Sequence, residues 1–345
     1  MRANAVEGRA EREQGLRLRN FGAGIGDVSE IGLGCWQIGG ADWGDVSEED
    51  ALHLLEAAVE AGTTFFDTAD VYGLGRSEAL LGRFLKRTDS SASLTVATKL
   101  GRYPEPGWPL NFEAKSIREH TEASLKRLDV ETLDLTQLHC SPTEVLRRGE
   151  VFDTLRELQA EGKIRRFGAS VESMEEALIC LKQPGLASLQ IIFNIFRQKP
   201  IDTLFDAATS AGVALIVRLP LASGVLSGKY NRSTQFASSD HRNYNRDGAA
   251  FNVGETFAGI PFDVAVDLAE RVREVVPEGL TMSQFALRYC LDFEAVTVVI
   301  PGARDAQMAR ANAEVSDLAE LSPEVHARLR AIYTEFAHAA IRGPY

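Results

Sequence analysis

Four titratable side chains of four different types follow three consecutive apolar segments of this sequence: Asp67 and Tyr72 in FFDTADVYG, Lys99 in VATKLG and His139 in LTQLHC. Such a set suits proton transfer to a carbonyl oxygen. Tyr72 would be the acid, and the Lys99 ammonium would lower the tyrosine pKa by stabilising the tyrosinate. Asp67 would hold the ammonium, and His139 would orient the carbonyl. Because none of these groups supplies electrons, the reaction needs a separate hydride donor.

Each of these residues also has a simpler interpretation, as a turn aspartate, a packed tyrosine, a surface lysine or a structural histidine. Lys99, however, follows an apolar run whose end should be buried, and a buried lysine needs a counter-charge. Asp67 is the available carboxylate. Since the ends of neighbouring parallel strands lie side by side in a barrel, we expect the four side chains to converge on one pocket.

The elements that must position these residues repeat along the chain as a short apolar run, a polar loop and an amphipathic stretch. The eight apolar runs are Ile31–Cys35, Thr64–Phe66, Leu94–Ala97, Leu133–Leu138, Ile164–Ala169, Leu189–Phe193, Val213–Val217 and Val296–Ile300. They lack strict alternation, which favours parallel strands buried on both faces. Eight strands alternating with helices predict an α/β protein with a (β/α)₈ TIM barrel, and a doubly wound sheet is the alternative.

Helix starts are marked by polar caps before several of the amphipathic stretches. Ser47 precedes three acidic residues, and capping-box spacing occurs at Ser116 with Glu119, Ser173 with Glu176 and Thr281 with Gln284. Outside the repeat we expect a flexible N-terminal tail over residues 1–15 and a short hairpin within Leu16–Val28. A long loop over 223–260 follows strand seven, and a C-terminal helix runs from Pro323 to about Phe336. Residues 16–345 would then form a single domain.

Composition narrows the class of protein. The 345 residues carry a formal net charge of −12, which argues against a nucleic-acid partner bound through a basic face. No apolar stretch has the length of a membrane span or the pattern of a signal peptide. The four cysteines are far apart and form no C-x-x-C pair, so we expect a cytoplasmic protein without disulfides. The remaining histidines lack metal-ligand spacing and suit solvated positions, so no metal site is predicted.

Six ordered blocks, FFDTADVYG, ATKLG, LTQLHC, FGAS, RLPLASGVLSGKY and VIPGAR, resemble the aldo-keto reductase superfamily across residues 16–320. The opening EIGLGCWQIGG is similar to the first strand of that family. This resemblance implies a (β/α)₈ barrel that binds NADP(H) and reversibly reduces an aldehyde or ketone. It places the family's catalytic tetrad on Asp67, Tyr72, Lys99 and His139.

The resemblance also implies a set of cofactor-binding residues. They are Gly34, Cys35, Trp36, Ser170, Gln190, Arg218, Leu219, Pro220, Leu221, Ser223, Gly224, Lys229, Gly302, Ala303, Arg304 and Asn312. Within this set, Arg304 would contact the adenosine 2′-phosphate. Three positions depart from the family pattern. Val171 replaces an asparagine, Met308 replaces a glutamine, and Arg218 stands where many relatives have a ring that stacks on nicotinamide. A guanidinium plane can also stack, so we expect Arg218 to lie against the nicotinamide; the alternative is an ion pair with a carboxylate of the 223–260 segment.

Two alternative functions can be weighed against the sequence. The segment ASGVLSGKY is similar to the β subunits of voltage-gated potassium channels, which implies a cofactor-bound regulatory subunit as an alternative. A barrel glycosidase would need a second strand-end carboxylate facing Asp67, and the matching blocks contain none. The expected partner is a small-molecule carbonyl substrate. Its pocket would be formed by the 101–111 loop, Trp36, Trp43 and the 223–260 segment, and neither the substrate nor the oligomeric state follows from the sequence.

Overall fold

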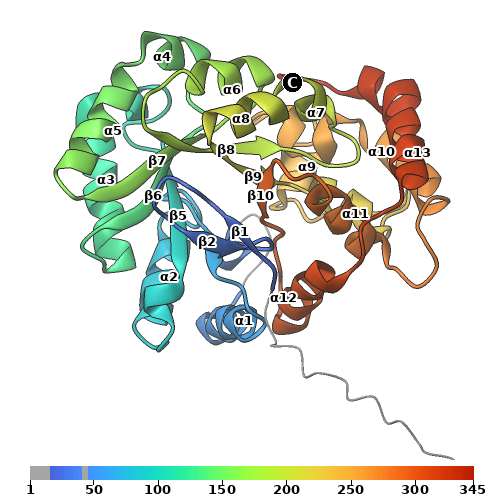
Figure 1. Ribbon diagram of the computed structural model, residues 1–345, viewed down its shortest axis with the longest axis horizontal. Helices are drawn as coiled ribbons and strands as arrows, with labels where there is room; N and C mark the ends of the chain where they lie inside the picture. Colours follow the sequence, from blue (N-terminus) through green and yellow to red (C-terminus); the bar gives the residue numbers. More distant parts are fainter. Residues whose placement is uncertain (1–15, 41–45) are drawn as a thin grey trace, which may run out of the picture.

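The computed structural model describes residues 16–40 and 46–345, so the expected tail over residues 1–15 and Trp43 lie outside the described residues. Within them, eight parallel strands form one curled sheet (Figure 1). The strands follow chain order around the sheet: β3 (Leu33–Gly34), β4 (Phe65–Asp67), β5 (Thr95–Leu100), β6 (Leu133–His139), β7 (Ile164–Ser170), β8 (Leu186–Ile192), β9 (Ala214–Arg218) and β10 (Val296–Val299). Each overlaps one of the eight predicted runs.

Hydrogen bonds join the first strand of this sheet to the last. Parallel bridges link Ile31 with Val299 and Gly34 with Gly302, and the Gly34 amide donates to the Pro301 carbonyl at 3.0 Å. The sheet therefore closes into the ring of a (β/α)₈ barrel, and the doubly wound alternative is wrong.

Helices connect the strands, and most of them cover the outside of the ring (Figure 1). They are α1 (Glu48–Glu60), α2 (Arg76–Leu85), α3 (Ala114–Leu128), α4 (Thr143–Arg148), α5 (Glu150–Ala160), α6 (Met174–Cys180), α7 (Lys199–Thr203), α8 (Phe205–Ala211), α9 (His241–Tyr244), α10 (Phe262–Arg273), α11 (Met282–Leu291), α12 (Ala306–Ala313) and α13 (Pro323–Ile332). None of the helices in the described ranges combines the length and apolar character needed to traverse a lipid bilayer.

Three of the four predicted helix caps are present. Ser47 accepts the Asp50 amide, and capping boxes form at Ser173 and Thr281. The prediction for Ser116 is wrong, because α3 begins two residues earlier, after an extended Glu113, and Ser116 is buried inside its first turn. The capping spacing at Ser116 is therefore a coincidence within a helix that has already started.

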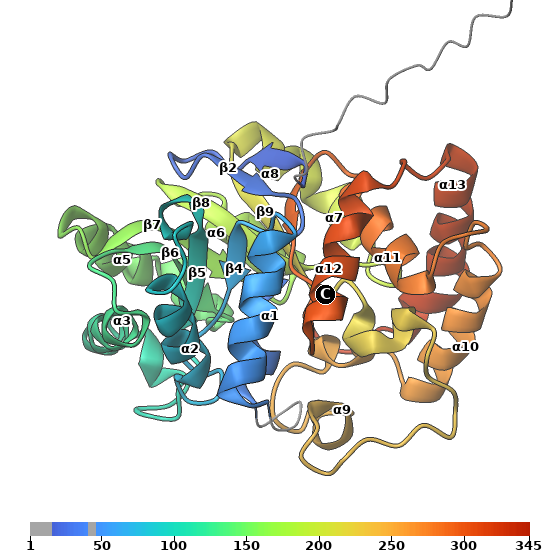
Figure 2. The same cartoon turned by 90° about the horizontal axis from the view of Figure 1, so that it is seen from below.

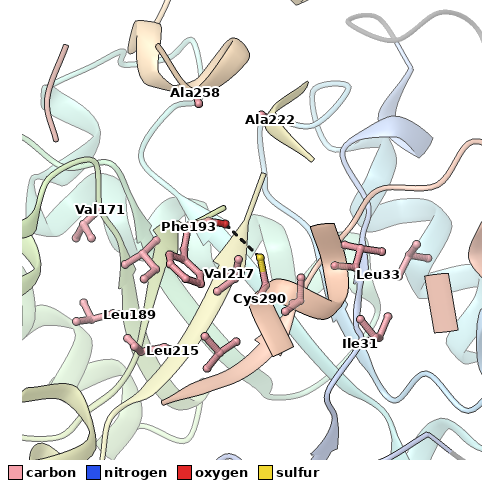
Figure 3. Packing of buried hydrophobic residues seen from close by; sticks show 14 of the residues in the cluster. Ile31, Leu33, Val171, Leu189, Phe193, Leu215, Val217, Ala222, Ala258 and Cys290 are labelled. Carbon is pink, nitrogen blue, oxygen red and sulfur yellow. Dashed lines mark hydrogen bonds between the residues drawn. The ribbon is translucent and has the colours of Figure 1, made fainter. Parts of the chain in front are cut away.

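Apolar side chains on the outer faces of the strands pack against the surrounding helices. Figure 3 shows Leu215 and Val217 of β9 beside Phe193, which follows β8, and Cys290 of α11 donates a weak hydrogen bond to the Phe193 carbonyl at 3.7 Å. All four cysteines are free and buried, and each contributes apolar volume. This packing fixes the strands from outside and leaves their carboxyl ends to carry polar side chains.

A hairpin of β1 (Leu18–Asn20) and β2 (Asp27–Ser29) covers the amino end of the barrel. Its Phe21 and Val28 are buried in one cluster with Phe65 and other side chains that fill the barrel interior. Arg19 anchors the hairpin further by donating to the carbonyls of Leu291, Phe293 and Val296. Figure 2 shows the hairpin at one end of the molecule and α9 at the opposite end.

The long segment after β9 occupies the carboxyl end of the barrel. Residues 219–261 form short turns around α9 before α10 begins, and the C-terminal residues hold them in place. The Arg342 amide and Nε both donate to the Gly259 carbonyl, at 3.1 and 3.0 Å, and its Nη1 pairs with Asp247 at 2.7 Å. Tyr345 is in turn held by Lys199, whose backbone amide donates to the tyrosine oxygen at 2.9 Å. We call residues 219–261 the insertion.

Candidate active site

Asp67, Tyr72 and Lys99 form one hydrogen-bonded group at the carboxyl ends of β4 and β5. Lys99 Nζ donates to Asp67 Oδ2 at 2.7 Å, to the Thr68 carbonyl at 2.8 Å and lies 3.1 Å from the Tyr72 hydroxyl. The register explains the meeting: Asp67 pairs with Ala97, and Lys99 is two residues further along β5, on the same face. The expected counter-charge for the buried lysine is therefore in place.

His139 completes the group from β6. Gln137 pairs with Lys99 across the sheet, and His139 follows two residues later on the same face. Its ring meets the Tyr72 ring edge-on, with centroids 6.0 Å apart. His139 Nδ1 is buried and has no hydrogen-bond partner among the described residues. The structure thus brings together all four residues that the sequence proposed as a tetrad.

Burial sets the protonation of this group. The Lys99 ammonium lowers the Tyr72 pKa, as expected, but burial raises it by more, so the phenol pKa lies above its usual value. Burial acts to lower the Lys99 pKa, but Asp67 and the Tyr72 oxygen outweigh it and the pKa lies above its usual value. Burial and the Arg102 charge lower the His139 pKa well below its usual range. The site therefore holds a neutral phenol, an ammonium and a neutral imidazole.

Two close loop contacts hold Tyr72 where it is. A Cβ on Gly73, whose φ is +60°, would lie 2.2 Å from the Gly39 carbonyl oxygen, and a Cβ on Gly39 would lie 2.9 Å from the Tyr72 carbonyl carbon. The loop after β3 and the loop after β4 can therefore touch only as backbone. On its other side the Tyr72 ring stacks on Trp36 with centroids 5.9 Å apart. Trp36 is thus a wall of the tyrosine site.

Ser170 and Gln190, both expected to bind the cofactor, are linked to the tetrad. Gln190 Nε2 donates to Asp67 Oδ1 at 2.7 Å, and Ser170 Oγ donates to Gln190 Oε1 at 3.3 Å. These contacts follow from the β7–β8 register, in which Ser170 pairs with Gln190. Both residues consequently lie at the same end of the barrel as the tetrad.

Arg218 makes the ion pair that sequence analysis left as the alternative. Its Nη1 lies 3.4 Å from Glu255 Oε2 in the insertion, and its Nη2 donates to the Val171 carbonyl at 3.3 Å. Arg218 Nε is buried without a partner among the described residues. The sequence does not identify Glu255 as this partner, because Glu255 lies 37 residues beyond Arg218 in a segment that has no strand or long helix to place it.

Further cofactor positions lie where β3 meets the end of β10. Gly34 bridges to Gly302, whose carbonyl accepts from Asn312 Nδ2 at 3.3 Å. Ala303 is buried beside them, while Arg304 is exposed and makes no ion pair within the described ranges. Cys35 is an exception in this set. Its thiol is fully buried and donates to the Leu33 carbonyl at 3.6 Å, its amide donates to the Asp67 carbonyl at 2.8 Å, and its carbonyl accepts from Ser77 Oγ at 2.8 Å.

The loop after β9 has an unusual backbone. Leu219, Ala222 and Ser223 all have positive φ, at 55°, 47° and 55°, and Gly224 follows with φ 93°. Non-glycine residues avoid this region, and such strain concentrates at functional sites. Ser223 Oγ donates to the Glu255 carbonyl at 3.0 Å, so the strained turn also holds the insertion. Pro220 and Leu221 lie within this turn, whereas Lys229 is exposed beyond it.

Donor atoms of Cys140, Glu172 and Glu255 lie within 4.8 Å of one another among the described residues. This is a possible metal-ligand set by distance alone. Arg102 Nη2, however, donates to both carboxylates, at 2.8 and 2.7 Å, and burial raises the Cys140 pKa to about 12. Arg102 and Arg218 already place two positive charges against these carboxylates, so the set does not suit a cation.

Asp70 and His120 form a second buried pair. The sequence places His120, like the other histidines outside the tetrad, at a solvated position, which is wrong. The structure buries both and places the Asp70 carboxylate 3.0 Å from His120 Nδ1. A cavity of about 660 Å³ beside α3 is lined in part by this pair and by none of the tetrad. The pair ties α3 to the Tyr72 loop and lies outside the reaction centre.

Comparison with known proteins decides the family. The model of the aldo/keto reductase family matches residues 30–334. The chain belongs to the aldo/keto reductase family. Membership makes it an NAD(P)H-dependent carbonyl oxidoreductase.

Individual aldo/keto reductases resemble the chain over most of its length. Aldo-keto reductase YhdN of Bacillus subtilis is 28% identical over 295 residues, which cover 84% of this chain and 86% of that protein. Aldo-keto reductase yakc [NADP(+)] of Schizosaccharomyces pombe is 30% identical over 62% of this chain and 64% of its own. Among solved structures, the holo form of aldo-keto reductase AKR11C1 from Bacillus halodurans superposes with a TM-score of 0.75 at 25% identity. It covers 95% of this chain and 98% of that one.

Proposed function

We propose that the protein is an NADPH-dependent reductase that reversibly reduces an aldehyde or ketone to an alcohol, with Tyr72 as the proton donor. The observation that carries this proposal is the buried contact of Lys99 Nζ with Tyr72 at 3.1 Å and with Asp67 at 2.7 Å. A phenol kept protonated by burial can donate a proton, and the adjacent ammonium stabilises the phenolate that remains.

The cofactor positions have the chemistry that NADPH requires. Arg304 is exposed without an ion pair within the described ranges, so its charge is available to a phosphate. Gln37 Oε1 is buried without a partner among the described residues and would lie 2.6 Å from a Cβ on Gly302. Close backbone approach and an orphaned acceptor both suit a polar ligand at this junction. The printed name of the yakc relative, which includes NADP(+), supports the same cofactor.

NADPH, when bound, supplies the hydride for this reaction. Tyr72 donates a hydrogen bond to the carbonyl oxygen and then transfers its proton to the alkoxide that forms. Lys99 stabilises the resulting phenolate, and Asp67 fixes the ammonium in that position. His139 remains a neutral imidazole and orients the carbonyl by a hydrogen bond, because burial and the surrounding cations oppose its protonation. Trp36 shields the phenol from water.

The test is NADPH oxidation with a panel of aldehydes, α-dicarbonyls, ketosugars and aromatic ketones. The substitution Tyr72→Phe removes the acid and keeps the ring against Trp36, so we expect kcat to fall by at least about 10²-fold. NADPH affinity, measured by fluorescence titration, should stay nearly unchanged. A Tyr72→Phe enzyme that retains more than a tenth of the wild-type kcat would show that another group donates the proton.

The panel also tests the regulatory alternative. Tight NADPH binding without turnover of any carbonyl would favour a cofactor-bound subunit similar to those of potassium channels. We further propose that residues 16–345 act as a single catalytic domain, and that the protein works in the cytoplasm on a small-molecule substrate. Fractionation of the native host, with the protein followed by antibody, tests this location.

A further inference from the structure

Four charged side chains from four separate elements meet beside His139. Arg102 follows β5, Glu172 follows β7, Arg218 ends β9, and Glu255 belongs to the insertion. Arg102 donates to Glu255 with both Nη atoms, at 3.3 and 2.7 Å, and to Glu172 with Nη2 at 2.8 Å. Arg218 adds its contact with Glu255 at 3.4 Å. We call these four residues the charge cluster.

The charge cluster lies next to the reacting groups. Burial is the largest cause of the low His139 pKa, and the charges of Arg102 and Arg218 lower this pKa further. The Arg102 guanidinium lies over the Phe251 ring at 5.8 Å, and Phe251 meets Trp36 edge-on at 6.2 Å. Since Trp36 stacks on Tyr72, these aromatic contacts connect Arg102 to the proton donor. Arg102 therefore belongs to the same set of packed side chains as Tyr72, and it lies close enough to His139 for its charge to act on the imidazole.

The two carboxylates of the charge cluster are held unequally. Glu255 faces both guanidinium groups, and despite its burial they lower its pKa to about 2. Among the described residues Glu172 has one guanidinium partner, Arg102, and it is about one-fifth exposed. Burial and the facing Glu255 raise its pKa to about 7, with Glu176 of α6 adding to the effect and Arg102 and Arg218 opposing it. Glu172 is consequently the weakly held anion of the pair.

Charge balance points to the group that replaces Glu172. With Glu172 neutral, two guanidinium groups face only Glu255, and a buried site with one unbalanced positive charge requires one negative charge. A carboxylate matches the planar guanidinium through two parallel hydrogen bonds. A neutral substrate would leave this charge without a partner.

We propose that the substrate is an oxo acid, an aldehyde or ketone that carries a carboxylate, and that Arg102 binds this carboxylate in place of Glu172. This inference rests on the proposed reductase function and names its substrate class. Binding transfers the Arg102 contact from one carboxylate to another while Glu172 takes up a proton. The affinity for an oxo acid should therefore fall as pH rises through about 7, where Glu172 ionises.

The experiment compares 4-oxobutanoate with its methyl ester as substrates of the full chain with NADPH, from about pH 6 to 8.5, a range that brackets the ionisation of Glu172. The two compounds share the reacting aldehyde and differ in charge. For wild type, we expect kcat/KM to favour the acid at about pH 6, and the acid-to-ester ratio to fall by up to about tenfold per pH unit above about 7. The fall should appear as a rising KM for the acid with little change in kcat.

Two variants locate the effect. Arg102→Met should lower the acid-to-ester ratio at about pH 6 by about 30-fold or more, because the guanidinium that binds the carboxylate is lost. Glu172→Gln should remove the pH dependence of the ratio, since its amide does not titrate. Arg118→Met is the matched control: Arg118 also pairs with two glutamates, on the outer surface, and its loss should leave the ratio unchanged.

The outcomes separate this inference from the proposed function. If neutral carbonyls are reduced while acid and ester are equally good substrates of wild type at every pH, the oxo-acid inference is wrong and the reductase function stands. If no carbonyl compound, charged or neutral, supports NADPH oxidation, the proposed function itself fails. The wild-type comparison decides the first point even if Arg102→Met does not fold.

Discussion

At the residue scale, the reaction centre depends on the balance between burial and charge. Tyr72 sits beside an ammonium and is nevertheless held protonated, because its desolvation exceeds the attraction of Lys99 and so raises its pKa. The sequence predicts the partners of Tyr72 correctly, since each follows an apolar strand. It does not predict this balance, because the extent of burial depends on Trp36 and His139, which only the folded chain brings against the phenol.

Arg304 offers a second test at this scale. If it binds the 2′-phosphate, Arg304→Ala should weaken NADPH binding by about ten- to a hundredfold and leave NADH binding nearly unchanged, as expected for one charge-assisted contact. Fluorescence titration with both cofactors measures the effect. Arg310→Ala is the control, because Arg310 lies on α12 and pairs with Glu60 of α1. Equal losses for the two cofactors would place Arg304 away from the phosphate.

At the element scale, the strands and most helix starts are predictable because each depends on nearby residues. Buried parallel strands require apolar runs, and a capping serine acts on an amide only about three residues away. The charge cluster is not predictable in this way. Arg102 and Glu255 are 153 residues apart, and no periodic pattern marks either one. The insertion places Glu255 through single contacts such as that with Ser223.

The contact between the loops after β3 and β4 gives a prediction for these elements. Gly73→Ala adds a methyl group 2.2 Å from the Gly39 carbonyl, so the Tyr72 loop must move. We expect kcat to fall by at least about tenfold, in addition to a stability loss of about 1–2 kcal/mol from the left-handed backbone. Gly162→Ala is the matched control, with φ +76° and nothing within 4 Å of the added carbon. It should lose stability alone, and an equal loss of kcat in both variants would contradict the loop argument.

At the scale of the whole molecule, the barrel separates stability from chemistry. The hairpin fills the amino end with Phe21, which stacks on Phe65 with centroids 5.7 Å apart, while the polar groups occupy the carboxyl end. Phe21→Ala should therefore destabilise the fold by about 3–5 kcal/mol through the cavity it leaves. Thermal unfolding measures this loss. Well below the unfolding temperature, kcat per folded molecule should remain close to wild type, and a parallel loss of kcat would show that the two ends are coupled.

The contacts that attach the insertion determine which of its residues can be replaced by a loop from a related enzyme. Its Glu255 faces Arg102 and Arg218, and its Gly259 is fixed by Arg342 from the C-terminal residues. A foreign loop grafted across these two points would need its own counterparts for both. Replacement within residues 229–246 alone would keep both anchors, and it would also keep Asp247, which pairs with Arg342, and Phe251, which lies against Arg102. Directed libraries for new substrates should accordingly start within that interval.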